Sequence, residues 1–129
     1  MTTLLMKALN NYVSAAGLLA SMQALATAEA FGIAADRFTS VINGSTGRNN
    51  TTEQKIMPFI ASRQYNSGFS LRLMAKDVNI ASELMQSAGF GTPITPALTS
   101  YLAAALEKLG KDADHTKLFE MVNPVDKSE

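Results

Sequence analysis

The chain has 129 residues, a length that suits one domain with a single hydrophobic core, and 47% of them are hydrophobic whereas 17% are charged. Lysines and arginines balance aspartates and glutamates, 11 against 11, which excludes the strong field that draws nucleic acid or an anionic membrane to a protein. The sequence has no cysteine and one histidine, His115, which excludes disulfides, thiol catalysis and a multi-histidine metal centre, so we expect no metal.

The first predicted element is a long helix. It begins at Thr2 or Thr3, and Gly32 ends it. At 1.5 Å per residue it measures about 45 Å, so in a chain of this size the other elements must wrap around it. Its apolar residues recur at steps of three and four: Leu5, Leu9, Tyr12, Ala16, Leu19, Met22 and Ala26.

The apolar run of residues 12–26 within this helix faintly resembles a secretory signal peptide. Ser14, Ser21 and Gln23 interrupt the run, which argues against secretion. No stretch reaches the unbroken apolar length of a membrane span. We therefore expect a cytoplasmic protein.

A second helix is predicted over residues 36–42, followed by a glycine- and asparagine-rich loop over residues 43–50. Thr51 with Gln54 has the spacing of a capping box, which predicts a short third helix. Pro58 should kink or restart that helix, because its ring clashes with the preceding turn.

A further loop, residues 63–69, leads to a fourth helix over residues 70–88 that Gly89 ends. Thr95 is predicted to cap a fifth helix, and Gly110 to close it. The alternating pattern of a β-strand occurs nowhere in the sequence. We therefore predict an all-α fold, a helical bundle around one long central helix.

A sixth helix should start at Asp112 or Asp114 and place His115 in its first turn, before ending near residue 122. The predicted organisation is one helical domain over residues 1–122, with a frayed tail over residues 123–129.

Two pairs of side chains could carry chemistry. Lys7 and Asn11 are four residues apart and share a helix face. A lysine exchanges protons when burial or a nearby cation lowers its pKa, and an asparagine can bind a hydroxyl or carboxylate group. Arg72 and Lys76 share another face, where a bound anion would offset their repulsion. The alternative for both pairs is a solvated surface, as exposed lysines usually indicate.

Glycines and hydroxyl groups in the loop of residues 44–47 could present amides to an anion. The loop matches neither a P-loop nor a dinucleotide-binding fingerprint, so we interpret it as a connection between helices.

Several segments together resemble the β-hydroxyacid dehydrogenases, which include the 3-hydroxyisobutyrate dehydrogenases. The most specific is the run Lys7-Ala8-Leu9-Asn10-Asn11 at the start of an alanine-rich helix, similar to the family's catalytic segment. The other matches follow in the family's order over nearly the whole chain: residues 28–30, 43–48, Phe69, 73–77 and 110–114.

The resemblance implies a fold similar to the C-terminal domain of 6-phosphogluconate dehydrogenase, in an enzyme whose N-terminal Rossmann domain holds NAD or NADP. By the same resemblance, Lys7 would be the catalytic acid–base group and Asn11 would orient the substrate. Phe69 would wall the site, and Lys76 would contact the cofactor near the nicotinamide. Lys7 and Lys76 would then face one hollow that the Rossmann domain covers.

The implied activity is NAD(P)-linked oxidation of a small 3-hydroxy acid such as 3-hydroxyisobutyrate, by a homodimer. The family's glycine-rich run is missing from residues 1–6, and the Rossmann domain is absent, so we expect the isolated chain to be inactive. Two alternatives remain open: a non-catalytic helical dimerisation module from a truncated gene, and a relative of the tartronate semialdehyde reductase or 6-phosphogluconate type.

Overall fold

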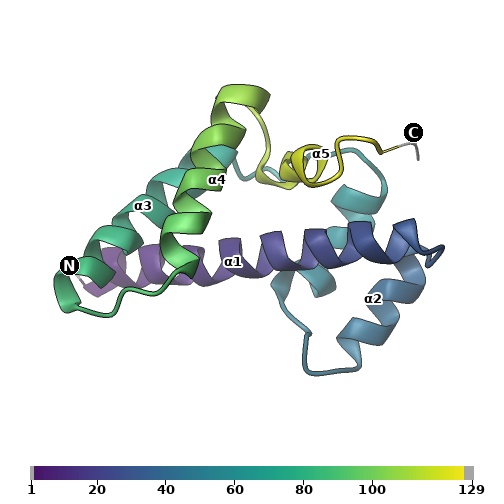
Figure 1. Ribbon diagram of the computed structural model, residues 1–129, viewed down its shortest axis with the longest axis horizontal. Helices are drawn as coiled ribbons and strands as arrows, with labels where there is room; N and C mark the ends of the chain where they lie inside the picture. The colour runs from purple at the N-terminus through teal and green to yellow at the C-terminus, as the bar shows by residue number, and fades with distance from the viewer. Residues whose placement is uncertain (1, 127–129) are drawn as a thin grey trace.

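Helix α1, Thr2–Ala30, is the axis on which the other elements pack (Figure 1). The structure is a computed structural model that describes residues 2–126. Over those residues it is helical without a β-strand, which confirms the all-α prediction. The remaining elements are α2 (Ala35–Asn43), the π-helix η1 (Thr51–Ala61), α3 (Leu71–Ala88), α4 (Ile94–Leu109), the 3-10 helix η2 (His115–Leu118) and α5 (Phe119–Val122).

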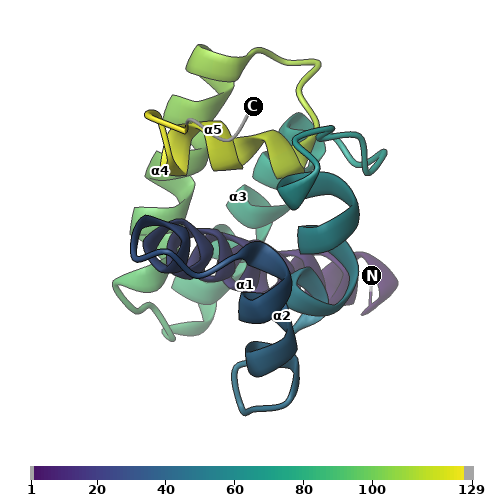
Figure 2. The same ribbon diagram turned by 90° about the vertical axis from the view of Figure 1, so that its right-hand side faces the viewer.

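Helices α3 and α4 lie against the N-terminal half of α1, and α2 lies beside its C-terminal half (Figure 1). In the view along α1, α4 and η1 are on opposite sides of it (Figure 2). Met22 is buried as predicted, whereas the other most buried apolar positions of α1 lie one residue before predicted ones: Ala8, Ala15, Leu18 and Leu25.

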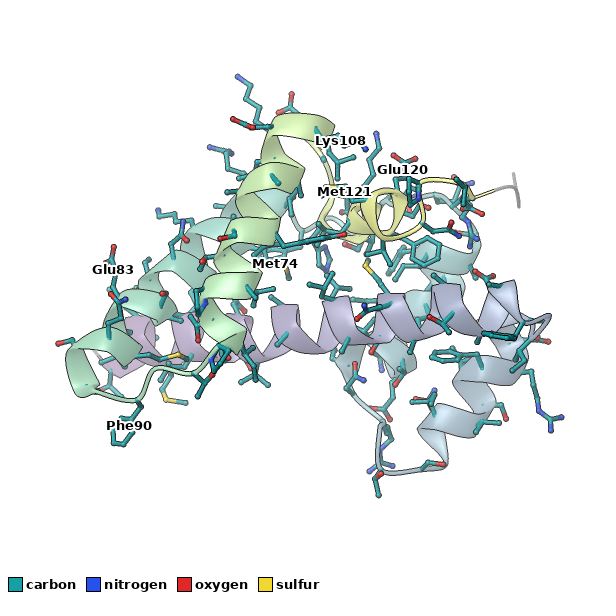
Figure 3. The ribbon with its side chains drawn as sticks, viewed as in Figure 1. Met74, Glu83, Phe90, Lys108, Glu120 and Met121 are labelled. Carbon is teal, nitrogen blue, oxygen red and sulfur yellow. The ribbon has the colours of Figure 1, made fainter. Side chains whose placement is uncertain are left out.

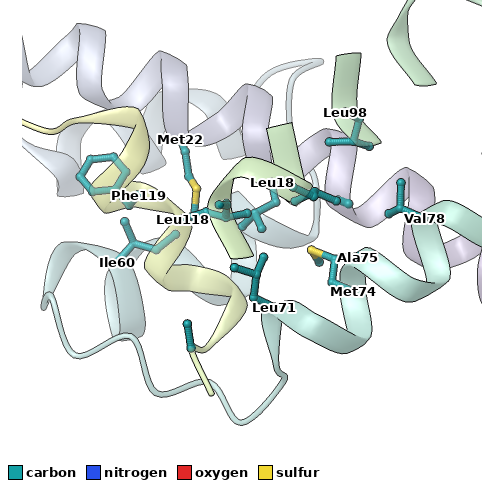
Figure 4. Packing of buried hydrophobic residues seen from close by; sticks show 14 of the residues in the cluster. Leu18, Met22, Ile60, Leu71, Met74, Ala75, Val78, Leu98, Leu118 and Phe119 are labelled. Carbon is teal, nitrogen blue, oxygen red and sulfur yellow. The ribbon is translucent and has the colours of Figure 1, made fainter. Parts of the chain in front are cut away.

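The hydrophobic core lies between α1, α3, α4 and the C-terminal helices. Exposed Glu83 and Lys108 stand on the outside, whereas Met74 is buried beneath them (Figure 3). Leu18 and Phe119, from opposite ends of the sequence, belong to the same core cluster (Figure 4). Each fully buried side chain of this size contributes about 1.5–3 kcal/mol, so this cluster is the main stabilising feature of the fold.

Helix α3 is delimited as its sequence predicts. The Ser70 Oγ accepts a hydrogen bond from the Leu73 amide at 3.1 Å, which caps the start. Gly89 ends the helix in the left-handed conformation, with φ at 83°. These caps fix the orientation of α3 against α1.

The predicted cap of the third helix is wrong by two residues. Thr51 is buried inside η1, and its amide donates to Asn49 Oδ1 at 2.9 Å. The Thr52 hydroxyl in turn accepts from the Asn49 amide at 3.0 Å, so Asn49 and Thr52 cap each other. Pro58 lies inside η1, where the wider π turn accommodates a ring that would clash in an α-helix.

The predicted cap of the fifth helix is also wrong. Helix α4 begins at Ile94, directly after Pro93, and Thr95 lies inside it. The Thr95 hydroxyl is buried against α3, 3.5 Å from the Met85 sulfur. A threonine near a helix start can therefore serve packing rather than capping.

Arg63 ties the C-terminal segment to α1. Its Nε donates to Asp126 Oδ2 at 2.6 Å, and its Nη2 lies 3.4 Å from Glu29 Oε1. The guanidinium also sits over the ring of Phe119, 4.9 Å from its centre. The tail predicted to fray over residues 123–129 is thus held as far as Asp126, and residues 127–129 lie outside the described part of the chain.

Candidate functional site

A lysine and a buried carboxylate meet where α1 passes α3. Lys7 Nζ lies 3.2 Å from Asp77 Oδ2 and 3.5 Å from Oδ1. The Lys7 side chain is 59% exposed, whereas that of Asp77 is 6% exposed. The Asp77 carboxylate therefore lies in the interior, whereas the Lys7 amine remains accessible to solvent.

Asn11, one turn further along α1, binds the same carboxylate. Its Nδ2 donates to Asp77 Oδ2 at 2.6 Å. Because a carboxylate only accepts hydrogen bonds, this contact fixes the amide orientation and turns Oδ1 away from Asp77. The Asn11 Oδ1 accepts from the exposed side chain of Asn10 at 3.2 Å, a bond that a ligand can replace.

A hollow of about 410 Å³ opens beside Asn11, a size typical of small-molecule sites. Side chains from both ends of the sequence meet in it. Its wall is partly apolar and partly polar, formed by Asn11, Ser14, Gln54, Lys55, Phe59, Ser67, Phe69, Met74 and His115.

One side of the hollow is held in place by hydrogen bonds to Asp114. The Asp114 carboxylate accepts from the Gly68 amide at 2.8 Å and from the Ser67 hydroxyl at 2.9 Å. It also accepts from the Thr116 amide at 3.0 Å, which makes Asp114, and not Asp112, the cap of η2. These bonds lower the pKa of Asp114 although burial opposes them. Asp114 thereby fixes the loop that carries Phe69.

His115 forms a neutral part of the wall. Its Nδ1 lies 3.0 Å from the Phe69 carbonyl oxygen, so Nδ1 must carry the proton. Its Nε2 is buried and has no hydrogen-bond partner among the described residues. Burial, together with the charge of Lys55, lowers the pKa of His115 to about 4, against an opposing effect of Asp114. The imidazole is therefore uncharged at neutral pH.

Lys55 is a member of this site that the sequence did not reveal. It is half-buried, and burial lowers its pKa while the Asp114 charge acts in the opposite direction. A π-helix turns less per residue than an α-helix, so the α-helical periodicity used to assign faces does not apply to residues 51–61. The sequence did place His115 in a first helical turn, as observed, but gave no sign of its burial.

The structure brings Lys7, Asn11 and Phe69 to one region and leaves Lys76 on the adjoining surface. The partner of Lys7 is Asp77, not Lys76. Consecutive residues of an α-helix point about 100° apart, so Lys76 faces outward on α3 where Asp77 faces α1. Neither Lys7 nor Lys76 lines the hollow, so the expectation that both face it is not met, and the loop of residues 44–47 does not line it either.

Two features are absent from the described part of the chain. Among residues 2–126, no group of three or more histidine, aspartate or glutamate side chains is arranged to hold a metal ion. No helix in that part of the chain is long and apolar enough to cross a membrane.

A family model described as the NAD-binding domain of NADP-dependent 3-hydroxyisobutyrate dehydrogenase matches residues 3–122. A probable mitochondrial 3-hydroxyisobutyrate dehydrogenase of Arabidopsis thaliana is 33% identical over 122 residues, which cover 90% of this chain and 34% of the relative. An NAD-dependent L-serine dehydrogenase of Pseudomonas aeruginosa is 27% identical over 124 residues, covering 92% of this chain and 42% of that protein.

Solved structures share the fold. Mycobacterium tuberculosis 3-hydroxyisobutyrate dehydrogenase with L-serine superposes with a TM-score of 0.80 and 25% identity, over 90% of this chain and 42% of that one. The 3-hydroxyisobutyrate dehydrogenase of Salmonella typhimurium, at 16% identity, has a TM-score of 0.79 over 90% of this chain and 40% of its own. The chain thus spans well under half the length of these relatives.

Proposed function

Because the chain belongs to the 3-hydroxyisobutyrate dehydrogenase-like β-hydroxyacid dehydrogenase family, we propose that it forms the substrate side of an NAD(P)-dependent oxidoreductase acting on a small 3-hydroxy acid. A Rossmann domain outside these residues would hold the nucleotide. The observation that carries the proposal is the arrangement of Lys7 and Asn11 on the buried carboxylate of Asp77, beside a hollow of substrate size.

In this proposal Lys7 is the proton-transfer group. During oxidation its Nζ takes the proton of the substrate hydroxyl, and during reduction it returns that proton to the carbonyl oxygen. Asp77 holds one side of the amine, so the remaining directions of Nζ face the exposed surface where substrate would lie. The bound nicotinamide cofactor would accept or supply the hydride.

The other site residues bind and orient. Asn11 orients the substrate: its Nδ2 is committed to Asp77, so its Oδ1 would accept from a second donor of the substrate, such as the amine of L-serine, while the hydroxyl proton goes to Lys7. Phe69 limits the access of water on one side of the hollow. Lys76 is an exposed cation next to Asp77 in the sequence, and it fits contact with an anionic dinucleotide that covers this surface.

The test is turnover by the polypeptide that joins this chain to its nucleotide-binding domain, assayed for NAD(P)-linked oxidation of 3-hydroxyisobutyrate and L-serine. Lys7→Ala should reduce kcat by about 10²–10⁴-fold, the usual contribution of a general acid–base group. Because Asp77 keeps its hydrogen bond from Asn11 when Lys7 is removed, the variant should remain folded, and its unfolding temperature is measured to confirm this. Lys108→Ala is the matched control, because Lys108 is an exposed lysine of α4, an element that contributes no residue to the wall of the hollow. Full activity of Lys7→Ala would remove the mechanism, and turnover by the isolated 129-residue chain would remove the need for a second domain.

We further propose that the protein is a homodimer, the property on which the alternative of a non-catalytic assembly module depends. Phe31 and Phe90 are exposed, and Phe90 projects from the turn after α3 (Figure 3). An apolar groove between α1 and α4 includes Ile94 and Leu98. Such surface favours self-association. Sedimentation equilibrium that finds monomers at all concentrations would contradict this proposal.

A further inference from the structure

We propose that the hollow beside Asn11 holds the anionic group of a small acid, and that Lys55 is its charged contact. The inference rests on the proposed function and deepens it, because it assigns the acid group of the substrate to a particular side chain. It also makes Lys55 a specificity-determining residue of the site.

Charge is the first argument. Among the side chains that line the hollow, Lys55 is the one lysine, arginine, aspartate or glutamate, and His115 is uncharged at neutral pH because its pKa is lowered. Two carboxylates lie behind the wall: Asp114 accepts from Ser67, and Asp77 accepts from Asn11 and pairs with Lys7. The hollow therefore favours an anion over a neutral or cationic ligand.

The Lys55 side chain is half-buried, yet it makes no hydrogen bond or ion pair with another described residue. Burial lowers the pKa of Lys55, and the charge of Asp114, which does not contact it, opposes that effect only in part. A bound carboxylate would supply the missing contact in a charge-assisted hydrogen bond.

The hollow is connected to Lys7 through Asn11. Asn11 lines the hollow, and through Asp77 it is connected to Lys7. Lys7 and Asn11 are four residues apart on α1, a rise of about 6 Å. The proposal places the acid group of the substrate at Lys55 and its hydroxyl toward the Asn11 side of the hollow. Phe59 and Met74 offer its carbon atoms an apolar wall.

The experiment is a nuclear magnetic resonance titration of the ¹⁵N-labelled 129-residue chain with 3-hydroxyisobutyrate and, separately, with its uncharged methyl ester. The acid should shift the amide signals of Asn11, Lys55 and Phe69 in a saturable manner. Lys55→Met and Lys55→Gln should each weaken acid binding by about tenfold or more, as expected for loss of a charge-assisted contact, and leave ester binding unchanged. Lys108→Met, on α4 outside the hollow, is the control and should bind the acid like the parent chain.

Equal affinity of the parent and both Lys55 variants for the acid, shifts confined to the surface around Lys76, or no saturable shift at all would each overturn the proposal. The outcome is separable from that of the proposed function. If Lys7→Ala abolishes turnover while the Lys55 variants bind and turn over normally, the function stands and the subsite does not. If binding depends on Lys55 but Lys7→Ala keeps full turnover, the subsite stands and the proposed mechanism does not.

Discussion

The buried imidazole of His115 should make the stability of this protein depend on pH in a defined window. In the fold its pKa is lowered from 6.5 to about 4, chiefly by burial and next by the charge of Lys55. In the unfolded chain the group returns to its ordinary value. Between these two pKa values the unfolded state binds more protons than the folded state, so the free energy of unfolding falls as the pH is lowered.

At 1.36 kcal/mol per pKa unit, the lowered pKa of His115 corresponds to about 3 kcal/mol of stability, which is lost in full once the pH is below both pKa values. By linkage, about 1.5 kcal/mol is already lost at pH 5.5 and about 2.5 kcal/mol at pH 4.5, relative to pH 7.5. For a domain of this size that is a substantial part of the total stability.

The assay is urea unfolding, followed by far-ultraviolet circular dichroism, of the parent chain and of His115→Asn. The asparagine amide can still donate to the Phe69 carbonyl but does not titrate. Asp114, whose pKa is below its ordinary value of 3.8, stays ionised in both proteins over this window. The difference between the two pH curves therefore isolates the histidine, whatever cavity the substitution leaves. Parallel curves, or an imidazole that titrates near 6.5 in the folded protein by nuclear magnetic resonance, would refute the reasoning.

Three further substitutions test one ion pair and two helix ends of the fold, each by urea unfolding. Arg63→Met should lower the free energy of unfolding by about 2–3 kcal/mol, because it leaves the Asp126 carboxylate without its guanidinium; an unchanged midpoint would show that the C-terminal segment is not held by this pair. Gly89→Ala should cost about 1 kcal/mol, since an alanine at φ of 83° is strained even though its Cβ meets no atom, whereas Gly91→Ala, which has no such constraint, should be neutral. Asn49→Ala should cost about 1 kcal/mol through loss of its cap on η1, and a cost near zero would contradict that role.

Local signals predicted much of the fold because they act within one or two helical turns. The four-residue spacing of Lys7 and Asn11 puts them on one face of α1, and both reach the same carboxylate. The glycine stop at Gly89 was likewise predicted, since it depends on a few neighbouring residues, whereas Ser70, predicted as the first helical residue, is the cap.

The partner of Lys7 was not readable from the sequence, for a physical reason. Asp77 is 70 residues from Lys7, and its neighbour Lys76 has a similar claim to the site on pattern alone. The rotation of α3 decides which of the two faces α1, and buried side chains elsewhere on α3, such as Met74 and Val78, set that rotation. Tertiary packing therefore places an anion, Asp77, beside Lys7, whereas the sequence favoured a cation at that place.

This choice bears on how the site would become active. The Asp77 carboxylate is already buried and hydrogen-bonded, whereas the Lys7 amine remains mostly in water, where an ion pair contributes little. Covering the amine would lower the local dielectric and strengthen its attraction to Asp77. The chain therefore carries a preformed ion pair, and exclusion of water by a second domain would strengthen it.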